Sequence, residues 1–280
     1  MEVARTRVEA RTRARALRTN GSIALVPTMG AFHEGHLSLL RAARRAHAAV
    51  IASIFVNPLQ FGSLQDLATY PRDERRDLTL AEAEGVDLVF APTEEEMYPP
   101  GDSTRVTPGP LASVLEGASR PGHFEGVATV VAKLFNILAP QAAFFGQKDA
   151  QQVAIIRRLV VDLCFDVRIE VCETVREHDG LALSSRNVLL SEGQRVQAGI
   201  LSQALGAGRR ALDAGARPVE AEEAMREQVA EAPEIDLDYA RVVDEATFGA
   251  PVRGDSALLL IAVRLGGVRL IDNMRWAPCS

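Results

Sequence analysis

The stretch Pro27-Thr28-Met29-Gly30-Ala31-Phe32-His33-Glu34-Gly35-His36 joins an apolar run to a segment of helical periodicity. Ser22–Val26 before it predicts a short buried strand, and apolar residues recur at helical spacing after it. His36 therefore falls in the first turn of the predicted helix, where unpaired amide donors and the positive end of the helix dipole attract an anion. A histidine pair at that place could add positive charge where a pyrophosphate departs.

Two other interpretations of the histidine pair compete with phosphate binding. A single histidine is more often an ordinary surface or core residue, because titratable residues mark sites only statistically. The chain has only five histidines, however, and His33 and His36 share one loop with Gly30 and Gly35. A zinc site is disfavoured because H-E-G-H lacks the spacing of H-E-x-x-H and no cysteine pair is near. The loop therefore favours phosphate chemistry.

Short apolar runs bounded by turn residues alternate with segments of helical periodicity. Strands are predicted over Ser22–Val26, Ala49–Val56, Val86–Phe90, Ala142–Phe145 and Val167–Val171. Helices are predicted over His36–His47, Arg72–Glu84, Val127–Leu138 and Gln151–Leu163. This alternation is typical of an α/β protein with a Rossmann-like parallel sheet and crossover helices. Ligands of such folds bind beyond the carboxyl ends of the strands.

The residue composition of the sequence changes from Ser191 onward. Long segments rich in Ala, Glu and Arg are followed by predicted strands over 237–243, 257–263 and 268–272. We expect a Rossmann-like domain over residues 1–183 and a smaller C-terminal α+β lid domain over residues 184–280. The segment 184–191 would be the hinge, with the ligand cleft between the domains.

Composition limits the class of protein. The chain has 280 residues, of which 47% are hydrophobic and 24% charged, and its net charge of −6 disfavours nucleic-acid binding. The arginine-rich segment 5–18 predicts a solvated helix face; a nucleic-acid arm or a transit peptide is the weaker interpretation. No apolar run approaches the roughly 18 residues that cross a bilayer. Cys164, Cys172 and Cys279 match no metal or disulfide framework, which favours a reducing, cytoplasmic location.

A second candidate segment, 144–152, again places a glycine and charged residues between a predicted strand and a predicted helix. Lys148 at its centre could contact a polyphosphate, and Asp149 could accept bonds from a ribose or a metal-bound water. Gln152, one turn later, suits a hydroxyl or a carboxylate. A solvated turn with a helix cap explains the segment alone about as well.

Three further loops could contribute to a site. Ser184, Ser185 and Arg186 place two hydroxyls beside a guanidinium, which suits a phosphate, although such sequences are common in solvent loops. The segment 57–62 presents Gln60, which could bond a small polar acid, but Asn-Pro is a routine start of a turn. The segment 120–126 suits an anion or, equally, a capped helix. No G-x-S-x-G elbow accompanies His178 and Asp179, so a Ser-His-Asp triad is disfavoured.

Taken together, these segments resemble the pantoate–β-alanine ligase family, within the H-x-G-H nucleotidyltransferase superfamily. The motifs that carry the resemblance are P-T-M-G-A-F-H-E-G-H, N-P-L-Q-F-G, H-F-E-G-V-A-T-V-V-A-K-L-F-N, F-F-G-Q-K-D-A-Q-Q and D-G-L-A-L-S-S-R-N. They extend from about Ser22 to Asn187, with weaker similarity to the end. The resemblance implies condensation of pantoate with β-alanine, driven by ATP and Mg²⁺, through a pantoyl adenylate to give pantothenate, AMP and pyrophosphate. It also implies a homodimer.

The resemblance assigns roles by position. Catalytic roles are implied for His33, His36, Lys148 and Arg186. The ATP site is implied to include Met29, His33, Gly35, His36, Gly146, Lys148, Asp149, Val175, Leu183, Ser184, Ser185 and Arg186. Pantoate contacts are implied for Met29, Gln60, Phe61 and Gln152, while Arg120 and His123 would shape the entry loop.

The sequence departs from the family at two places. Arg75-Arg76-Asp77 stands where the family often has paired acids, so the metal ligands are unknown from the sequence. Leu183 stands where many members have methionine, which is a volume-conserving exchange.

Two rival functions differ in the residues they require. A nucleotidyltransferase that stops at nucleotide transfer would not need Gln60 and Gln152 for an acid. A regulatory nucleotide-binding protein would not need the full set of charge-stabilising groups that His33, His36, Lys148 and Arg186 provide. The sequence therefore favours the ligase.

Overall fold

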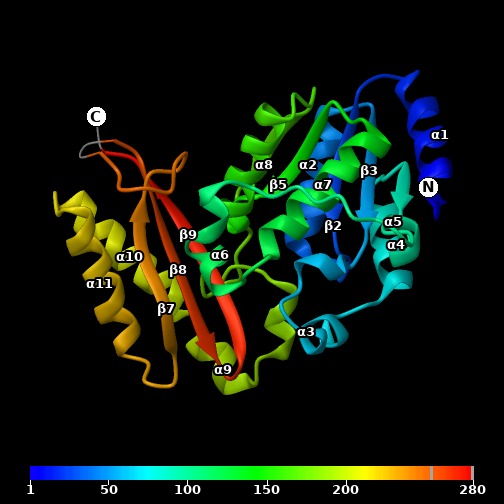
Figure 1. Cartoon of the computed structure of the whole chain (residues 1–280). Coiled ribbons are helices and arrows are strands. Elements are labelled where there is room, and N and C mark those ends of the chain that lie inside the picture. Colours follow the sequence, from blue (N-terminus) through cyan, green and yellow to red (C-terminus); the bar gives the residue numbers. More distant parts are fainter. Residues whose placement is uncertain (253–254, 279–280) are drawn as a thin grey trace. The chain divides into compact units, whose positions relative to one another are not determined.

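The computed structural model describes residues 1–252 and 255–278, and their contacts divide the chain into two units (Figure 1). The first unit comprises Met1–Gly146 and Gln151–Glu173. The second comprises Gln147–Ala150 and the chain from Thr174 onward. The domain boundary expected after residue 183 stays a prediction; the division by contacts falls earlier and adds the short Lys148 segment to the second unit. Cys279 lies outside the described residues.

Among the described residues, the first unit contains a six-stranded parallel sheet in the order β1-β4-β3-β2-β5-β6. Its strands are β1 (Glu2–Ala4), β2 (Ile23–Thr28), β3 (Ala49–Ile54), β4 (Leu88–Phe90), β5 (Ala142–Gly146) and β6 (Arg168–Cys172). The Rossmann-like parallel sheet is thus confirmed. Strand β1 was not among the predicted strands, because three residues are too short to show a pattern and their partner β4 is distant in sequence.

Helices cover both faces of this sheet. The helices of this part of the chain are α1 (Arg7–Arg18), α2 (Glu34–Ala46), α3 (Leu64–Thr69), α4 (Glu74–Ala83), α5 (Glu94–Met97), α6 (Glu116–Ser119), α7 (His123–Leu138) and α8 (Ala150–Asp162), with short 3-10 turns η1 (Pro58–Gln60) and η2 (Pro110–Ser113). Because successive strand residues point to opposite faces, Ile23 and Leu25 pack with α1, α7 and α8, whereas Ala24 and Val26 pack with α2 and α4. The four long helices predicted from periodicity are confirmed, with α7 beginning a turn earlier. No described helix is long and apolar enough to cross a membrane.

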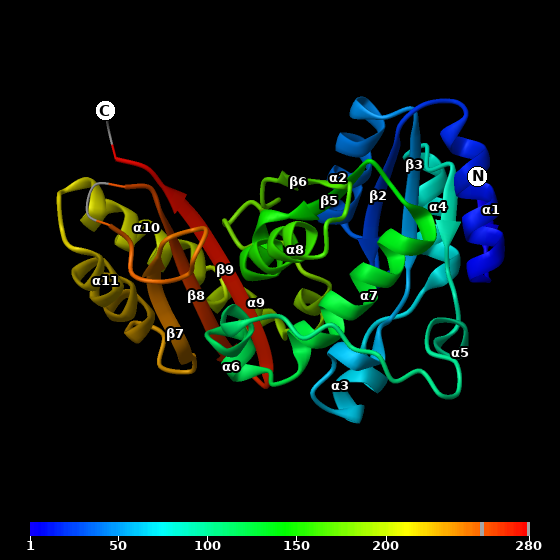
Figure 2. The ribbon, with the colours of Figure 1, turned by 45° about the horizontal axis from the view of Figure 1, so that its top comes forward.

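The strand order reverses beside β2. From β2 the chain adds β3 and β4 toward one edge and later returns to place β5 on the other side of β2, with Ala24 opposite Ala142 and Leu25 opposite Ala143 (Figure 2). Such a reversal leaves a crevice at the carboxyl ends of the two central strands, where ligands of open α/β sheets bind. The histidine loop follows β2 at that edge, and Gly146 ends β5.

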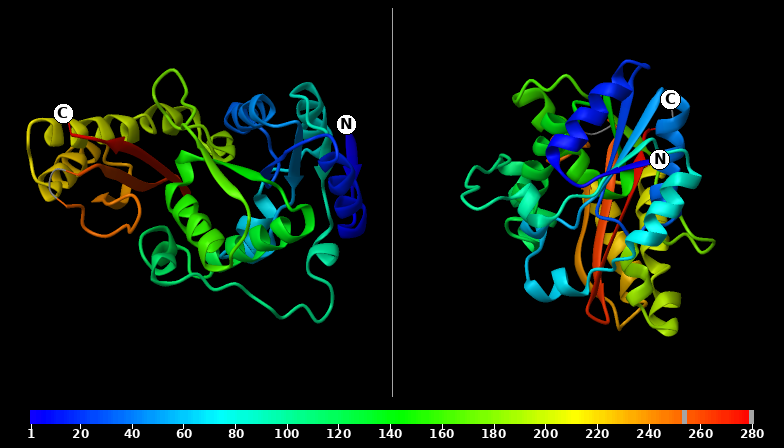
Figure 3. Two further views of the ribbon diagram at one scale, coloured as in Figure 1. Left: turned by 90° about the horizontal axis from the view of Figure 1, so that it is seen from above. Right: turned by 90° about the vertical axis from the view of Figure 1, so that its right-hand side faces the viewer.

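In the second unit the described residues form an antiparallel three-stranded sheet in the order β7-β8-β9, which confirms the α+β expectation. Its elements are η3 (Gln147–Asp149), η4 (Ser185–Leu189), α9 (Glu192–Gln197), α10 (Ile200–Asp213), α11 (Pro218–Ala230), β7 (Asp236–Val243), β8 (Ala257–Leu265) and β9 (Val268–Trp276). Helices α10 and α11 lie on one face of the sheet and share its core (Figure 3). A Cβ at Gly208 would lie 2.7 Å from Met225 and 2.8 Å from Leu259, so this glycine permits close packing of α10.

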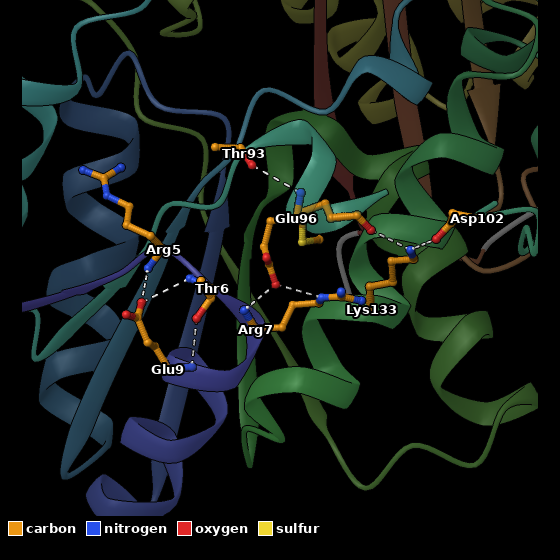
Figure 4. A network of polar contacts seen from close by, with 9 residues as sticks. Arg5, Thr6, Arg7, Glu9, Thr93, Glu96, Asp102 and Lys133 are labelled. Atoms are coloured by element: carbon orange, nitrogen blue, oxygen red, sulfur yellow. Dashed lines mark hydrogen bonds and ion pairs between the residues drawn. The ribbon is translucent and has the colours of Figure 1, made fainter. Parts of the chain in front are cut away.

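The arginine-rich N-terminus forms α1 and much of its charge is paired within the first unit (Figure 4). The Arg7 amide and Nε both donate to Glu96 Oε1, at 2.8 and 2.9 Å, and Arg5 pairs with Glu74. Thr6 and Glu9 form a capping box at the start of the helix. These pairings agree with a helix that belongs to the folded unit, and its Arg11 and Arg15 are exposed to solvent.

Candidate functional site

The histidine loop is shaped by bonds between its own side chains and backbone. His33 caps α2, and its Nδ1 accepts the Gly35 amide proton at 3.1 Å. His36 Nδ1 in turn accepts the His33 amide proton at 3.4 Å. The ring centroids of His33 and His36 lie 4.1 Å apart, so the two imidazoles predicted to act together are adjacent.

These contacts fix where the imidazole protons reside. A ring nitrogen that accepts a hydrogen bond carries no proton, so in each neutral ring the proton is on Nε2. In that tautomer each ring carries an Nε2–H group, which is the type of donor that a ligand oxygen accepts from. This tautomer suits phosphate oxygens at the start of α2, where the helix dipole acts in the same direction.

A buried carboxylate holds the loop in place. Asp77, which is 1% exposed, accepts the Phe32 amide proton at 2.7 Å and the Ala31 amide proton at 2.8 Å. A Cβ at Gly30, whose φ is +82°, would lie 2.8 Å from the same carboxylate. Burial raises the pKa of Asp77, while its two backbone hydrogen bonds oppose that rise. Asp77, the one acid of the Arg75-Arg76-Asp77 segment, thus holds the histidine loop through its backbone.

Gln60 lies in a network of fixed donors and acceptors after β3. Its Nε2 donates to Met29 Sδ at 3.1 Å, so two of the residues assigned to pantoate are in contact. Asn57 Nδ2 donates to Gln60 Oε1 at 3.0 Å and to the Gly126 carbonyl at 3.1 Å. A carbonyl can only accept, so the Asn57 side-chain amide is oriented, and its bond to Gln60 Oε1 leaves Gln60 Nε2 as the donor to Met29 Sδ.

The backbone around Gln60 is equally constrained. Its carbonyl contacts His123 Nδ1 at 2.8 Å and accepts from Arg120 at 3.3 Å, so the two residues expected in the entry loop hold η1. A Cβ at Gly126 would lie 2.4 Å from the Leu59 carbonyl group. Only glycine at this position lets α7 approach η1 so closely.

Three other residues of the first unit that the resemblance assigns to ligand binding make fewer of the contacts described above. Gly146 ends β5 at the reversal of strand order. Phe61 packs edge-on against Tyr70, with 5.6 Å between ring centroids. Gln152 is half-buried in the first turn of α8. Its neighbour Gln151 has a structural task, because it bonds the Glu116 amide and the carbonyls of Leu111 and Val114.

In the second unit, η3 carries Lys148 and Asp149, which are both partly exposed. Its buried neighbour Gln147 donates through Nε2 to Asn273 Oδ1 at 3.2 Å. The side-chain amide of Asn273 donates through Nδ2 to the backbone carbonyls of Gln147 and Lys148, both at 2.9 Å. A residue of β9 therefore holds the turn that carries the candidate cation.

A hairpin in the second unit brings other predicted residues together. The Leu183 amide donates to the Val175 carbonyl at 3.0 Å, so these two residues assigned to adenosine are adjacent. Ser184 caps η4 and accepts the Arg186 amide proton at 3.3 Å. Ser185 and Arg186 follow in η4 and are partly exposed. Each unit thus groups part of the candidate set.

The described residues supply no ready metal centre. Across 1–252 and 255–278, no three His, Cys, Asp or Glu side chains are grouped so that they could hold an ion. Asp77 is already occupied by two amide protons. Magnesium is usually bound by one or two carboxylates together with substrate phosphates, so its binding does not require such a cluster.

Comparison with known proteins is decisive about the family. The family model described as pantoate-beta-alanine ligase matches residues 2–275. Pantothenate synthetase of Mycolicibacterium smegmatis is 56% identical over 262 residues, which cover 93% of this chain and 82% of that protein. The chain belongs to the pantoate–β-alanine ligase family.

Solved structures of the family agree with the fold. Pantothenate synthetase from Thermus thermophilus has a TM-score of 0.93 and 48% identity, covering 99% of this chain and 100% of that one. Pantoate-beta-alanine ligase from Francisella tularensis, solved with beta-gamma ATP and beta-alanine, has a TM-score of 0.82 and 34% identity over 98% and 97% of the two chains. The family predicted from the sequence motifs is therefore confirmed.

Sequence reasoning assigned no supporting role in the candidate site to Asp77 or Asn273. Asp77 and Asn273 act on backbone groups 46 and 126 residues away along the chain. Local patterns contain no signal for such pairings. Gly126 carried a faint signal, because a glycine inside a helical pattern often reflects close packing.

An ion cluster beside the hairpin of Val175 and Leu183 makes a test by pH possible. Hydrogen bonds from Arg195 lower the pKa of Asp179 from its ordinary 3.8 to about 2. A lowered carboxyl pKa stabilises the fold above the unfolded-state value, and this contribution is lost as pH falls from 3.8 toward 2. We therefore expect the melting temperature of the wild type to approach that of Asp179→Asn over this interval. A constant difference between the two melting curves would contradict the pairing.

Proposed function

We propose that the chain catalyses the ATP-dependent condensation of pantoate with β-alanine through a pantoyl adenylate. The observation that supports this most is the His33–His36 loop beside the reversal of strand order, in which Nδ1 of both rings accepts a backbone amide proton, in a chain of this family. Such a loop favours transfer at a phosphate.

The first step forms the adenylate. A carboxylate oxygen of pantoate attacks the α-phosphorus of ATP, the bond from that phosphorus to the bridging oxygen breaks, and pyrophosphate leaves. His33 and His36 donate to phosphate oxygens, and Lys148 stabilises the charge that develops on them. Ser184, Ser185 and Arg186 hold the outgoing pyrophosphate, while Gly35, Gly146, Asp149, Val175 and Leu183 surround adenosine.

The second step forms the amide. The amine of β-alanine attacks the acyl carbon, AMP leaves with the electrons of the acyl–oxygen bond, and the amine loses a proton to solvent. Positioning and fixed charges supply the catalysis, so no covalent intermediate with the enzyme is needed. Magnesium enters with ATP as part of the substrate, bound to its phosphates.

Gln60 would recognise pantoate through its fixed Nε2–H, which suits a carboxylate or hydroxyl oxygen, with Gln152 as a second amide. Met29 and Phe61 would pack against the gem-dimethyl group. We expect Gln60→Ala to raise KM for pantoate about tenfold, because a hydrogen bond to a charged group is lost. Steady-state kinetics with Gln65→Ala, an exposed glutamine of α3, as the control would measure this. An unchanged KM would remove Gln60 from the acid pocket.

The homodimer and the cytoplasmic location also remain proposals, based on resemblance to the family. Cys164 and Cys172 are free thiols, which agrees with a reducing compartment. Light scattering on the purified protein would measure the assembly.

The proposed reaction has a direct test. Purified protein is incubated with MgATP and pantoate, with and without β-alanine, and the products are separated by chromatography. Pantothenate and AMP formed in equal amounts support the ligase. Nucleotide transfer without pantothenate would support a nucleotidyltransferase, and unchanged ATP would overturn both.

A further inference from the structure

The turn that carries Lys148 is fastened by one buried side chain from the last strand. Asn273 donates to the carbonyls of Gln147 and Lys148, both at 2.9 Å, and accepts from Gln147 Nε2 at 3.2 Å. Asn273 is 3% exposed and Gln147 is 4% exposed, so water does not replace these bonds. A single amide therefore makes three bonds to the turn.

Those bonds act on the two peptide planes that adjoin Lys148. The Gln147 carbonyl belongs to the peptide before the Lys148 Cα, and the Lys148 carbonyl belongs to the peptide after it. With both planes fixed, the direction of the Lys148 Cα–Cβ bond is fixed as well. The flexible lysine side chain thus starts from a defined point and direction.

Asn273 is itself held on both sides. The backbone N–H of Asn273 donates to Asp272 Oδ1 at 2.7 Å, and its backbone carbonyl accepts from Arg176 at 3.1 Å. Arg176 bonds both oxygens of Asp272, at 2.5 and 2.9 Å, and also donates to the Gly180 carbonyl at 2.9 Å. The same point on β9 therefore fixes the Lys148 turn and the hairpin that leads to Ser184.

The side chain of Gln147 contains a polar atom whose burial lowers the stability of the fold. Its Oε1 is buried and has no hydrogen-bond partner among residues 1–252 and 255–278. An unsatisfied buried acceptor costs stability, and departures from local optima concentrate at functional sites. This feature agrees with a turn shaped for the placement of Lys148.

We propose that Asn273 is a positioning residue for Lys148, and that the rate of adenylate formation depends on its bonds to the turn. The inference rests on the proposed function, in which Lys148 stabilises the developing charge. In this proposal Asn273 of β9 acts on the reaction through the turn that carries Lys148.

The test combines Asn273→Leu with Lys148→Ala. Leucine has the same number and branching of side-chain heavy atoms as asparagine but no donor or acceptor, so the turn loses its anchor. We expect kcat to fall about 100-fold, the effect of a misplaced group, with KM for pantoate little changed. In the Lys148→Ala background the same substitution should change kcat by no more than about 3-fold, because its effect acts through the lysine.

Gln147→Met keeps the test decisive if Asn273→Leu does not fold. It removes one bond to Asn273 together with the unpartnered oxygen, so its melting temperature should stay close to that of the wild type. We expect a loss of kcat of about tenfold that also disappears in the Lys148→Ala background. Asn136→Leu, on the exposed side of α7, is the control for the exchange.

Three outcomes separate the claims. No pantothenate from the wild type would overturn the proposed function itself. With an active wild type, an unchanged kcat in the folded variants, or an equal loss in both backgrounds, would overturn the positioning role. A loss confined to enzymes that contain Lys148 supports it.

Discussion

Replacing Lys148 with alanine should lower kcat for pantothenate formation about 1,000-fold and change KM for pantoate little. The ammonium meets charge that exists mainly in the transition state, so its removal should affect turnover more than binding. The chain has only two lysines among 31 basic residues. The other, Lys133, bonds Asp102 and the Met97 carbonyl. Steady-state kinetics and the rate of pyrophosphate exchange would measure the effect.

Arg158→Ala is a suitable control, because this guanidinium on α8 is 72% exposed and pairs with Asp162 on the same helix. Lys148→Arg should recover part of the charge but not the compact shape of the ammonium. Equal losses in kcat and in pantoate affinity for Lys148→Ala would contradict a role in the transition state.

Asp77→Ala should lower the free energy of unfolding by about 3 kcal/mol, since the buried Phe32 amide and the partly buried Ala31 amide lose their acceptor, at about 1–3 kcal/mol for a fully buried group. Activity should fall as well, because the freed backbone of Ala31 and Phe32 leads directly into His33. Urea unfolding and kinetics on the same preparations would measure both effects.

Asp77→Asn keeps the shape and one acceptor, so we expect losses between those of the wild type and the alanine variant. Glu95→Ala removes an exposed carboxylate from α5 and is the control. An Asp77→Ala enzyme of unchanged stability would exclude the carboxylate as the anchor of the loop.

Periodicity predicted the sheet and its long helices because those elements each bury a face over several turns or residues. Ile23–Thr28 and Ala49–Ile54 are apolar enough to be found without knowledge of their neighbours. The strand Glu2–Ala4 and the helix Glu94–Met97 are too short for a pattern, and distant partners stabilise them. Their existence depends on tertiary contacts that local sequence does not contain.

The candidate site likewise contains some residues that the sequence predicts and others that it does not. Motif resemblance assigned His33, Gln60 and Lys148, whose residue types suit the chemistry. The supports of these residues, Asp77 and Asn273, bond backbone atoms, which any sequence possesses. Pairings of that kind arise only when the chain is folded, so no local pattern could have predicted them.

The glycine of α7 has a practical consequence for anyone who wishes to redesign the acid specificity. Because a methyl group at Gly126 would collide with the Leu59 carbonyl at 2.4 Å, libraries that diversify this position would mostly return inactive clones. Diversity is better introduced at Met29 and Phe61, whose partly exposed side chains can change size without displacing main chain. The rigid helix would then serve as a constant template against which altered acids are selected.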